Sequence, residues 1–257
     1  MEDLKYWVWL SRINKTKIIL KLLEEYKTPE EIWRITKEEF IALGLSEKTA
    51  ENISGIEYRK NLDKYLEYMK KCNIEVVPIH SKYYPKKLRN IYDPPICIYV
   101  KGNKNILNNL GIAIVGCRNS TRYGENTAKK FAYNLSKYNI NIISGGARGI
   151  DTCSHMGSLG ANGKTIVVVG TGLDRVYPPE NKYLFEEVIK RGGAIVSEYV
   201  IGTEPVPYNF PQRNRIISGM AEGVIVVEAK EKSGTLITVD FALEQRKKCI
   251  CYSRKHR

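Results

Sequence analysis

The stretch NIISGGARGIDTCSH, residues 141–155, contains the residue types of an anion-binding loop: an apolar run, two glycines, an arginine and the start of a predicted helix. The amides at a helix N-terminus bind phosphate, and their partial positive charge disfavours a cation beside them. We place Arg148 in the first turn of this helix, where it is unfavourable unless an anion joins it. We therefore expect a phosphate on the amides after Gly145 and Gly146. The alternative is that Arg148 pairs with Asp151.

Four further predicted strands are each followed by a loop of similar composition. Their sequences are GCRNSTRYG, GTGLDRVYPPEN, YVIGTEPVPYNFPQRNR and KEKSGTLIT, and nearly every one combines glycine with Arg, Asn, Ser or Thr. The first of them contains Gly116, Arg118 and Ser120. Because ligands bind at the carboxyl ends of parallel strands, where such loops gather, we expect these loops to form one phosphate-binding site.

The stretch NFPQRNRIISG predicts a helix in which Asn209 or Phe210 precedes Pro211 as the first helical residue. Arg213 and Arg215 lie two residues apart, which is about 200° around a helix. We therefore expect one arginine to bind the ligand and the other to brace the fold. For Phe210 two interpretations stay open: a plug packed on the helix, or a platform on which a nucleic-acid base stacks.

The elements that position these loops fall into two regions. Residues 1–71 have the 3.6-residue periodicity of helices, and Thr28 and Thr36 each precede a glutamate by three residues, as in a capping box. Ser46 is expected to cap a further helix after a glycine turn. A helix, glycine turn and helix can offer amides to DNA phosphate. We favour a small helical bundle instead, because the first turn, SRINKTKII, lacks glycine.

From Glu75 onward, seven short β-branched runs alternate with helical stretches. Near-continuous apolar strands between helices indicate a parallel sheet covered by helices on both faces. We therefore predict an α/β protein, with a small helical domain over residues 1–71 and a larger domain over residues 72–257.

Two nucleotide-binding motifs can be excluded. A dinucleotide-binding loop needs G-x-G-x-x-G and a later acid, whereas only Gly116 and Gly124 are present and the next strand ends at Ser144 with no acid. The GKT of residues 163–165 is not a Walker A loop, because Ser158 stands where the first glycine belongs and the motif enters a strand.

A Ser/His/Asp triad is also disfavoured. Asp151, Ser154 and His155 are crowded on one helix start, so a helix cap and a surface histidine are the expected roles. We find no other set of residues suited to catalysis.

The chain of 257 residues carries 41 basic and 28 acidic side chains, a net charge of +13. This excess favours polyanions such as nucleic acid, although a solvated lysine-rich surface explains much of it. None of the six cysteines forms a CxxC pair, and the spacing of Cys249, Cys251 and His256 matches no usual zinc site, so we expect no metal. There is no apolar run of 18 residues and no signal-peptide pattern, which predicts a cytosolic protein without membrane contact.

Taken together, the loops resemble those of the DNA-processing protein A family, also called DprA or Smf. The matching motifs are VGCRNSTRYG, SGGARGID, GTGLDRVYPPEN, SEYVIGTEPVPYNFPQRNRIISG and EAKEKSGTLIT, in the family's order between about Tyr84 and Gln245. The helical N-terminus is similar to the family's small leading domain. The resemblance implies an extended Rossmann-like domain that binds single-stranded DNA, shields incoming strands and helps load the RecA recombinase during natural transformation. It also implies no cofactor and no catalysis.

Carried over motif by motif, the resemblance implies a pocket at the strand ends. Its expected residues are Gly116, Arg118, Ser120, Gly145, Gly146, Arg148, Phe210, Arg213 and Asn214. In YPPEN, Pro179 stands where some relatives have lysine, so we expect Lys182 to supply that phosphate contact.

The C-terminal end departs from the family pattern. Relatives continue beyond EQRKKCICYSRKHR through more of the domain. We expect KCICY to form the last strand of a shortened domain. The resemblance places a homodimer and RecA-binding surface near this end.

Two alternatives of another class remain. Phosphoribohydrolases of the same broad fold carry P-G-G-x-G-T-x-x-E, whereas this chain has Gly234 and Thr235 without the preceding motif and Thr238 in place of the glutamate. Without that acid, hydrolysis is disfavoured. A nucleotide-binding sensor that uses the same phosphate-binding loops stays open.

Overall fold

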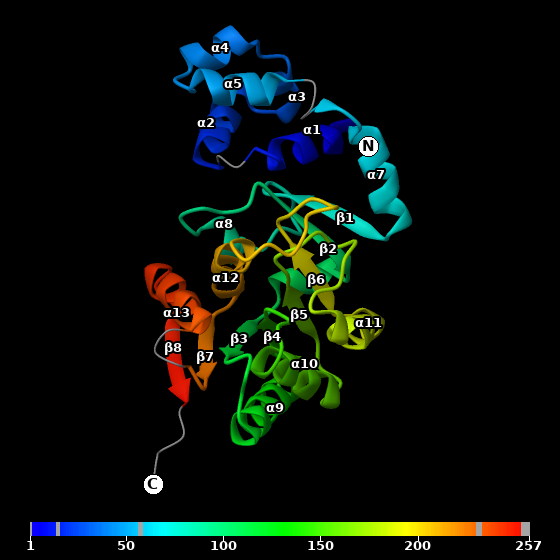
Figure 1. Ribbon diagram of the computed structural model, residues 1–257, viewed down its shortest axis with the longest axis vertical. Helices are drawn as coiled ribbons and strands as arrows, with labels where there is room; N and C mark the ends of the chain where they lie inside the picture. Colours follow the sequence, from blue (N-terminus) through cyan, green and yellow to red (C-terminus); the bar gives the residue numbers. More distant parts are fainter. Residues whose placement is uncertain (1, 14–15, 56–58, 230–232, 253–257) are drawn as a thin grey trace.

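The computed structural model describes residues 2–13, 16–55, 59–229 and 233–252 (Figure 1). Its α-helices are α1 (Glu2–Ser11), α2 (Thr16–Tyr26), α3 (Pro29–Trp33), α4 (Lys37–Ala42), α5 (Glu47–Ser54), α7 (Leu62–Lys71), α8 (Lys86–Arg89), α9 (Arg122–Lys137), α10 (Ile150–Gly160), α11 (Lys182–Lys190), α12 (Asn209–Met220) and α13 (Gly234–Glu244). Two 3₁₀ helices are η1 (Lys104–Asn108) and η2 (Pro179–Asn181).

Eight strands form one sheet, and each of the seven β-branched runs of the sequence contains one of them. The strands are β1 (Ile74–Pro78), β2 (Cys97–Gly102), β3 (Gly111–Gly116), β4 (Asn141–Ser144), β5 (Thr165–Val168), β6 (Ala194–Ser197), β7 (Gly223–Val227) and β8 (Lys248–Tyr252). The prediction that KCICY forms a strand is confirmed, since it is β8.

The sheet is mostly parallel and has the order β1-β2-β6-β5-β4-β3-β7-β8. Only the pairs β1–β2 and β2–β6 are antiparallel. From β3 the chain proceeds through β4, β5 and β6 in one direction, then returns to place β7 and β8 on the other side of β3. The direction of winding therefore changes between β3 and β7. In open α/β sheets, the crevice at such a point is where ligands bind.

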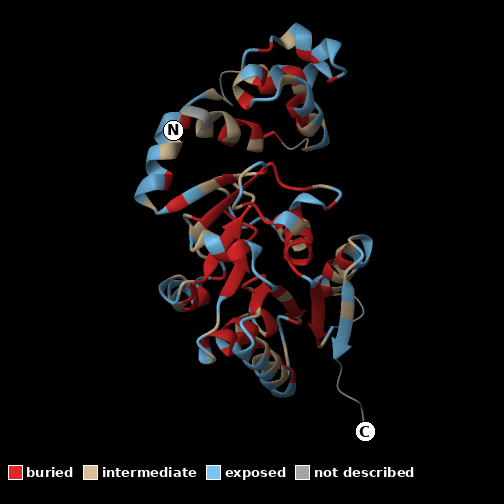
Figure 2. Ribbon diagram, turned by 180° about the vertical axis from the view of Figure 1, so that it is seen from behind, coloured by how far each residue is buried: buried red, intermediate tan, exposed pale blue. Residues whose placement is uncertain are grey.

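Helices cover both faces of the sheet, so that successive residues of a strand pack into hydrophobic clusters on opposite faces. Ala113 and Val115 of β3 pack with residues of α12 and α13, whereas Ile114, between them, packs with residues of α9 and α10. Both sides of each central strand are therefore buried (Figure 2), which explains the uninterrupted apolar runs in the sequence.

The N-terminal helices begin at the capping residues that the sequence indicates. Thr36 and Glu39 form a full capping box: the Thr36 hydroxyl accepts from the Glu39 amide at 3.2 Å and the Glu39 carboxylate accepts from the Thr36 amide at 2.7 Å. Thr28 and Ser46 cap α3 and α5 through their hydroxyls. Thr28 is a simple cap, because the described contacts include no return bond from Glu31.

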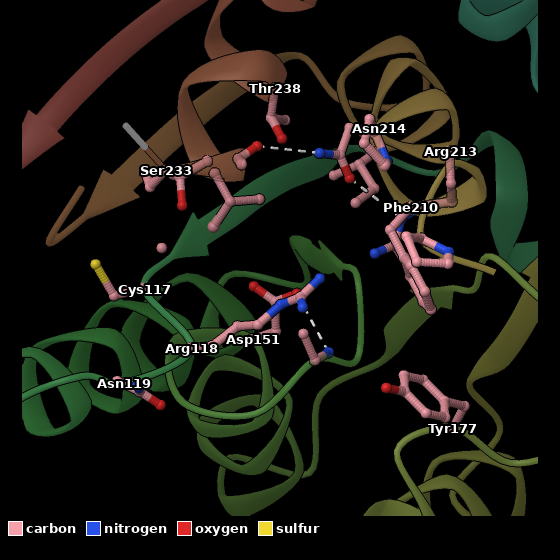
Figure 3. A pocket seen from close by; sticks show the side chains of 18 of the residues that line it. Cys117, Arg118, Asn119, Asp151, Tyr177, Phe210, Arg213, Asn214, Ser233 and Thr238 are labelled. Carbon is pink, nitrogen blue, oxygen red and sulfur yellow. Dashed lines mark hydrogen bonds between the residues drawn. The ribbon is translucent and has the colours of Figure 1, made fainter. Parts of the chain in front are cut away.

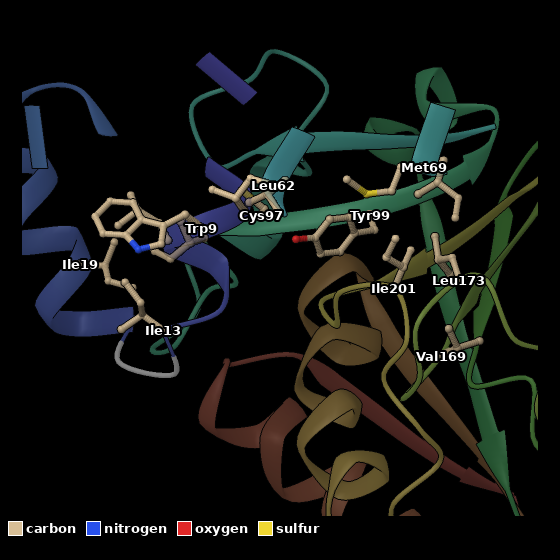
Figure 4. Packing of buried hydrophobic residues seen from close by; sticks show 14 of the residues in the cluster. Trp9, Ile13, Ile19, Leu62, Met69, Cys97, Tyr99, Val169, Leu173 and Ile201 are labelled. Carbon is tan, nitrogen blue, oxygen red and sulfur yellow. The ribbon is translucent and has the colours of Figure 1, made fainter. Parts of the chain in front are cut away.

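The helical region and the sheet share one hydrophobic core (Figure 4). Trp9 of α1 and Tyr99 of β2 both belong to it and are almost fully buried, and the Tyr99 hydroxyl lies 2.6 Å from the hydroxyl of Ser11. The division into domains at residues 71 and 72 stays a prediction. Across the described residues, no helix has the length and apolar character needed to cross a membrane.

Candidate nucleic-acid interface

A pocket of about 550 Å³ opens at the carboxyl ends of the strands, at the point where the winding changes direction between β3 and β7 (Figure 3). It is lined from the loops after β3, β4, β5, β6 and β7 and from the helices α10, α12 and α13. The lining residues are Val115, Gly116, Cys117, Arg118, Asn119, Ala147, Asp151, Tyr177, Pro205, Pro207, Phe210, Pro211, Arg213, Asn214, Ile217, Ser233, Gly234, Thr235 and Thr238. The loops that the sequence singles out therefore do converge.

Arg118 is the exposed cation of this pocket. Its guanidinium carbon lies 5.6 Å from the centre of the Phe210 ring, and no carboxylate of a described residue lies within 4.0 Å of its nitrogens. The Phe210 ring packs beside Gly170 and lies 5.4 Å from the ring of Tyr177. A cation without a carboxylate partner next to two aromatic rings suits a phosphate and its attached base.

The loop that carries Arg118 is held by Glu228, at the end of β7. The Glu228 carbonyl accepts from the amide of Cys117 at 3.1 Å. Its carboxylate accepts from the Thr121 amide at 2.9 Å and from the Thr121 hydroxyl. Glu228 has a φ of +54°, a conformation that is uncommon outside glycine and asparagine. In this strained conformation the Glu228 side chain reaches the start of α9.

The second loop, after β4, depends on two glycines. Gly146 has a φ of +64°, and a Cβ there would lie 2.6 Å from a Val167 methyl carbon. A Cβ on Gly145 would lie 2.7 Å from both the Arg213 guanidinium and the Asp151 carboxylate. These positions therefore have no room for a side chain. The Asp151 carboxylate accepts from the amide of Ala147 at 3.3 Å and so orients the loop.

The position and partner of Arg148 differ from the prediction. The helix α10 begins at Ile150 with Gly149 as its N-cap, because Gly149 adopts a φ of +73°. Arg148 thus lies before the helix, not in its first turn. Its guanidinium donates to the carboxylate of Glu180 in η2, not to Asp151, and this bond raises the pKa of Arg148 and lowers the pKa of Glu180.

Arg213 lines the pocket but donates its hydrogen bonds inward. Only 4% of its surface is exposed, and its guanidinium donates to the carbonyls of Gly145, at 2.7 Å, and Val168. Burial lowers the pKa of Arg213 to about 10, against the opposing effect of Asp151. Burial likewise raises the pKa of Asp151, although the charge of Arg213 lowers it. The buried cation therefore ties the ends of β4 and β5 together beneath the pocket.

Arg215 points to the other side of α12, as the two-residue spacing predicts. Its guanidinium donates to both carboxylate oxygens of Glu198, at 2.9 and 2.6 Å, and to Asp93 at 3.3 Å. This confirms that one arginine of the pair braces the fold. The helix itself begins at Asn209, so Pro211 is its third residue and not its first.

The predicted site residues divide into three groups. Those that line the main pocket are Gly116, Arg118, Phe210, Arg213 and Asn214. Those that line only an adjoining cavity of about 30 Å³ are Gly145 and Arg148. Those that line neither are Ser120, Gly146 and Lys182.

The last group has other contacts. The Ser120 hydroxyl donates to Glu125 at 3.2 Å, and the Gly146 carbonyl accepts from the Asn181 side chain at 2.9 Å. Lys182 is the first residue of α11 and is exposed. The structure thus brings neither the Ser120 hydroxyl nor the Lys182 ammonium to the pocket.

His155 is buried, so the expectation of a surface histidine is wrong. No part of it is exposed, since α10 is packed between α9 and the sheet. Its Nδ1 lies 2.7 Å from the Thr165 hydroxyl, which itself donates to the Ile142 carbonyl, so Nδ1 carries the proton. Burial, reinforced by the charge of Arg213, lowers the pKa of His155 to about 3.

Three contributors to the site were not predicted from the sequence: Tyr177, Asn181 and Glu228. Tyr177 and Asn181 belong to the YPPEN motif. Glu228 is the acid at the end of the apolar run VIVVEA, and an acid in that position can cap a helix that follows a neighbouring strand, here α9. No group of three metal-ligating side chains is found within the described part of the chain. His256, weighed earlier as a ligand, lies outside it.

Comparisons with known proteins agree with this architecture. Protein Smf of Escherichia coli K12 is 40% identical over 187 residues, which are 73% of this chain and 50% of that protein. DNA processing protein DprA of Bacillus subtilis is 42% identical over 190 residues, 74% of this chain and 64% of that protein. The chain thus spans between half and two thirds of the length of these curated relatives.

Solved structures show the same fold. The X-ray structure of DNA processing protein A from Streptococcus pneumoniae aligns with a TM-score of 0.81 at 33% identity, over 96% of this chain and 86% of that one. The protein from Helicobacter pylori, studied for its single-stranded DNA binding mode, aligns with a TM-score of 0.65 at 28% identity, over 72% of this chain and 83% of that one. The α/β, Rossmann-like prediction is therefore confirmed.

The family assignment rests on a match that covers most of the chain. The sequence profile of DNA recombination-mediator protein A matches residues 75–257, from the second residue of β1 onward. The chain therefore belongs to the DNA recombination-mediator protein A family.

Proposed function

We propose that this protein binds single-stranded DNA, without sequence preference, in the pocket at the strand ends. The observation that carries the proposal is the placement of Arg118, exposed in the pocket, 5.6 Å from the Phe210 ring and without a carboxylate partner among the described residues. The arginine would pair with a phosphate, and the ring would stack on a base. Every base has such a face, so the contact does not depend on sequence.

The family relationship extends the proposal to a role in the cell. A relative described for its single-stranded DNA binding mode shares the fold. We propose that the chain assists DNA uptake in natural transformation and RecA-mediated recombination in the cytoplasm, with single-stranded DNA, RecA and a second copy of itself as partners. In this role the protein acts by binding, without a cofactor and without catalysis.

The test is fluorescence anisotropy with labelled oligo(dT), single- and double-stranded, over a salt series. Single strands should bind more tightly, and affinity should fall with salt, by a slope of about 0.7 for each phosphate neutralised. Arg118→Ala should bind more weakly, with a slope reduced by about 0.7, while its unfolding transition stays unchanged. If wild type ignores DNA, or the variant binds equally well, the proposal fails.

A mononucleotide sensor is the competing function, since the pocket of about 550 Å³ can hold a nucleotide. Competition between dTMP and oligo(dT) separates the two functions. Displacement of the oligonucleotide by low concentrations of dTMP would favour the sensor. Phosphoribohydrolase activity finds little support, because the family-specific acid is replaced by Thr238.

A further inference from the structure

The amino end of α13 lines the pocket beside the loop after β7, and the contacts proposed above for Arg118 and Phe210 do not involve it. The helix has 11 residues, and its first turn contains no acidic side chain. Ser233 is its N-cap residue but makes no side-chain capping bond, and a Cβ on Gly234 would meet nothing within 4 Å. Amides in the first turn of a helix lack intrahelical partners and carry partial positive charge. Among the described residues, nothing covers the amides at this end of the helix.

Two threonines of α13 face this same part of the pocket. Thr235 and Thr238 are three residues apart and so lie on one side of the helix. They are only 8% and 2% exposed, both line the pocket, and neither hydroxyl has a hydrogen bond to a described residue. In Figure 3 the Thr238 side chain extends from α13 toward the pocket. The Ser233 hydroxyl is likewise buried and without a described partner.

The Ser233 hydroxyl is costly to bury, because it has lost water without gaining another hydrogen bond, whereas the hydroxyls of Thr235 and Thr238 are on the wall of the pocket. The neighbouring polar side chain does not relieve them. Asn214 of α12 donates to the carbonyl of Gly234 at 3.2 Å and accepts from Arg213, so its amide is already engaged. A set of donors left without acceptors in a pocket is suited to an anionic ligand that supplies the acceptors.

We propose that the amino end of α13, with the hydroxyls of Thr235 and Thr238, is a second phosphate subsite of the pocket, which holds another phosphodiester of the strand bound at Arg118. This inference rests on the proposed function. Its donors are neutral hydroxyls and amides, which suit the single charge of a phosphodiester. The strand then spans the crevice between the loop after β3 and the helix after β7.

The test compares two isosteric substitutions of buried, unpartnered threonines. Thr238→Val removes the hydroxyl and keeps the shape of the side chain. Thr171→Val is the control, because neither threonine hydroxyl has a described hydrogen-bond partner, but the Thr171 hydroxyl is sealed from solvent and Thr171 does not line the pocket. Each variant is assayed for oligo(dT) binding by anisotropy and for thermal unfolding, together with Thr235→Val, wild type and Arg118→Ala.

Thr171→Val should unfold at or above the wild-type temperature, because it loses a buried hydroxyl without a partner, and Thr238→Val should unfold near the wild-type temperature, because its hydroxyl is on the wall of the pocket. Only Thr238→Val should bind oligo(dT) more weakly, by at least fivefold, and Thr235→Val should follow it. Wild-type affinity in both pocket variants, with Arg118→Ala impaired, overturns the subsite and leaves the proposed function standing. If the pocket variants lose dTMP binding but bind oligo(dT) as tightly as wild type, the strand subsite is overturned in favour of a site for a free nucleotide. If wild type binds no DNA, the subsite falls with the proposed function.

Discussion

The guanidinium of Arg148 is neutralised by the carboxylate of Glu180, which reaches it from the 3₁₀ helix η2. Both side chains are about half exposed, at 59% and 49%, and Arg148 lines the small cavity beside the main pocket. A phosphate that approaches Arg148 must therefore compete with Glu180. The ion pair therefore limits the attraction that we propose between the pocket and a polyanion. Because both side chains are exposed, either one can be replaced without disturbing the core.

The first prediction follows from this competition. Glu180→Gln should tighten oligo(dT) binding a few-fold at low salt, because Arg148 becomes available to phosphate, and the gain should vanish at high salt. Arg148→Ala should weaken binding without unfolding the protein, and more strongly in the Glu180→Gln background than in the wild-type one. Equal effects in the two backgrounds, measured by anisotropy, would show that the pair does not matter for binding.

The second prediction concerns Glu228. For its removal, the loss of negative charge and the loss of loop positioning predict opposite changes in the affinity for oligo(dT). Removing a carboxylate beside a polyanion site should strengthen binding if charge alone matters. Because the Glu228 carboxylate holds the amide and hydroxyl of Thr121, we expect Glu228→Ala to weaken binding about fivefold, the equivalent of a lost cap of about 1 kcal/mol.

Glu228→Gln is the matched control, since it retains a side-chain acceptor and the same strained backbone. It should bind as tightly as wild type or more so. Tighter binding by the alanine variant would refute the positioning role.

The third prediction concerns the brace on the far side of α12. Arg215→Ala leaves the Glu198 carboxylate, whose side chain is only 16% exposed, without its cation, so the free energy of unfolding should fall by about 3–5 kcal/mol. Urea denaturation measures this change. Arg175→Ala is the control, because Arg175 pairs with Glu204 at an exposed site where ion pairs contribute at most about 1 kcal/mol. Similar losses in the two variants would contradict the assignment of Arg215 as a brace.

The fourth prediction is a pH dependence due to His155. Its folded-state pKa of about 3 lies below the value of about 6.5 expected in the unfolded chain. The unfolded state therefore binds the proton first as pH falls, and stability is lost below about pH 6.5. Between pH 7 and pH 5, protonation of this one group in the unfolded state should lower the free energy of unfolding by about 2 kcal/mol.

The measurement is the urea midpoint at pH 7 and pH 5 for wild type and His155→Gln. The difference between the two proteins isolates His155 from other groups, such as Asp151, whose raised pKa acts in the opposite direction. A pH dependence that is the same in both proteins would rule out the histidine as its cause.

The strands could be predicted from the sequence because burial on both faces leaves a plain local signature of apolar runs. Arg118 and Phe210 could be selected for a similar reason: glycine, arginine and aromatic residues gathered in the loops after those strands. Caps such as Thr36 are also local, since partner and acceptor lie within three residues of each other.

What the sequence could not predict depends on contacts between distant segments. Arg148 and Glu180 are 32 residues apart, and Glu228 lies 107 residues from Thr121. From the sequence, Arg213 is a plausible ligand contact. The structure shows that its guanidinium instead donates to the carbonyls of Gly145 and Val168, which lie far from it in the chain. His155 follows the same logic, because only the packing of α10 between α9 and the sheet removes it from the surface.

The core shared by Trp9 and Tyr99 makes the leading helices part of the folding unit that contains the pocket. Cutting the chain before β1 would uncover an apolar face on β2, and the bond from Ser11 to Tyr99 would lose one partner. We therefore expect a chain cut before β1 to be less stable than the intact chain. Heating the intact protein should disrupt helices and sheet in one cooperative transition, so that every molecule with an intact pocket also carries an ordered helical region.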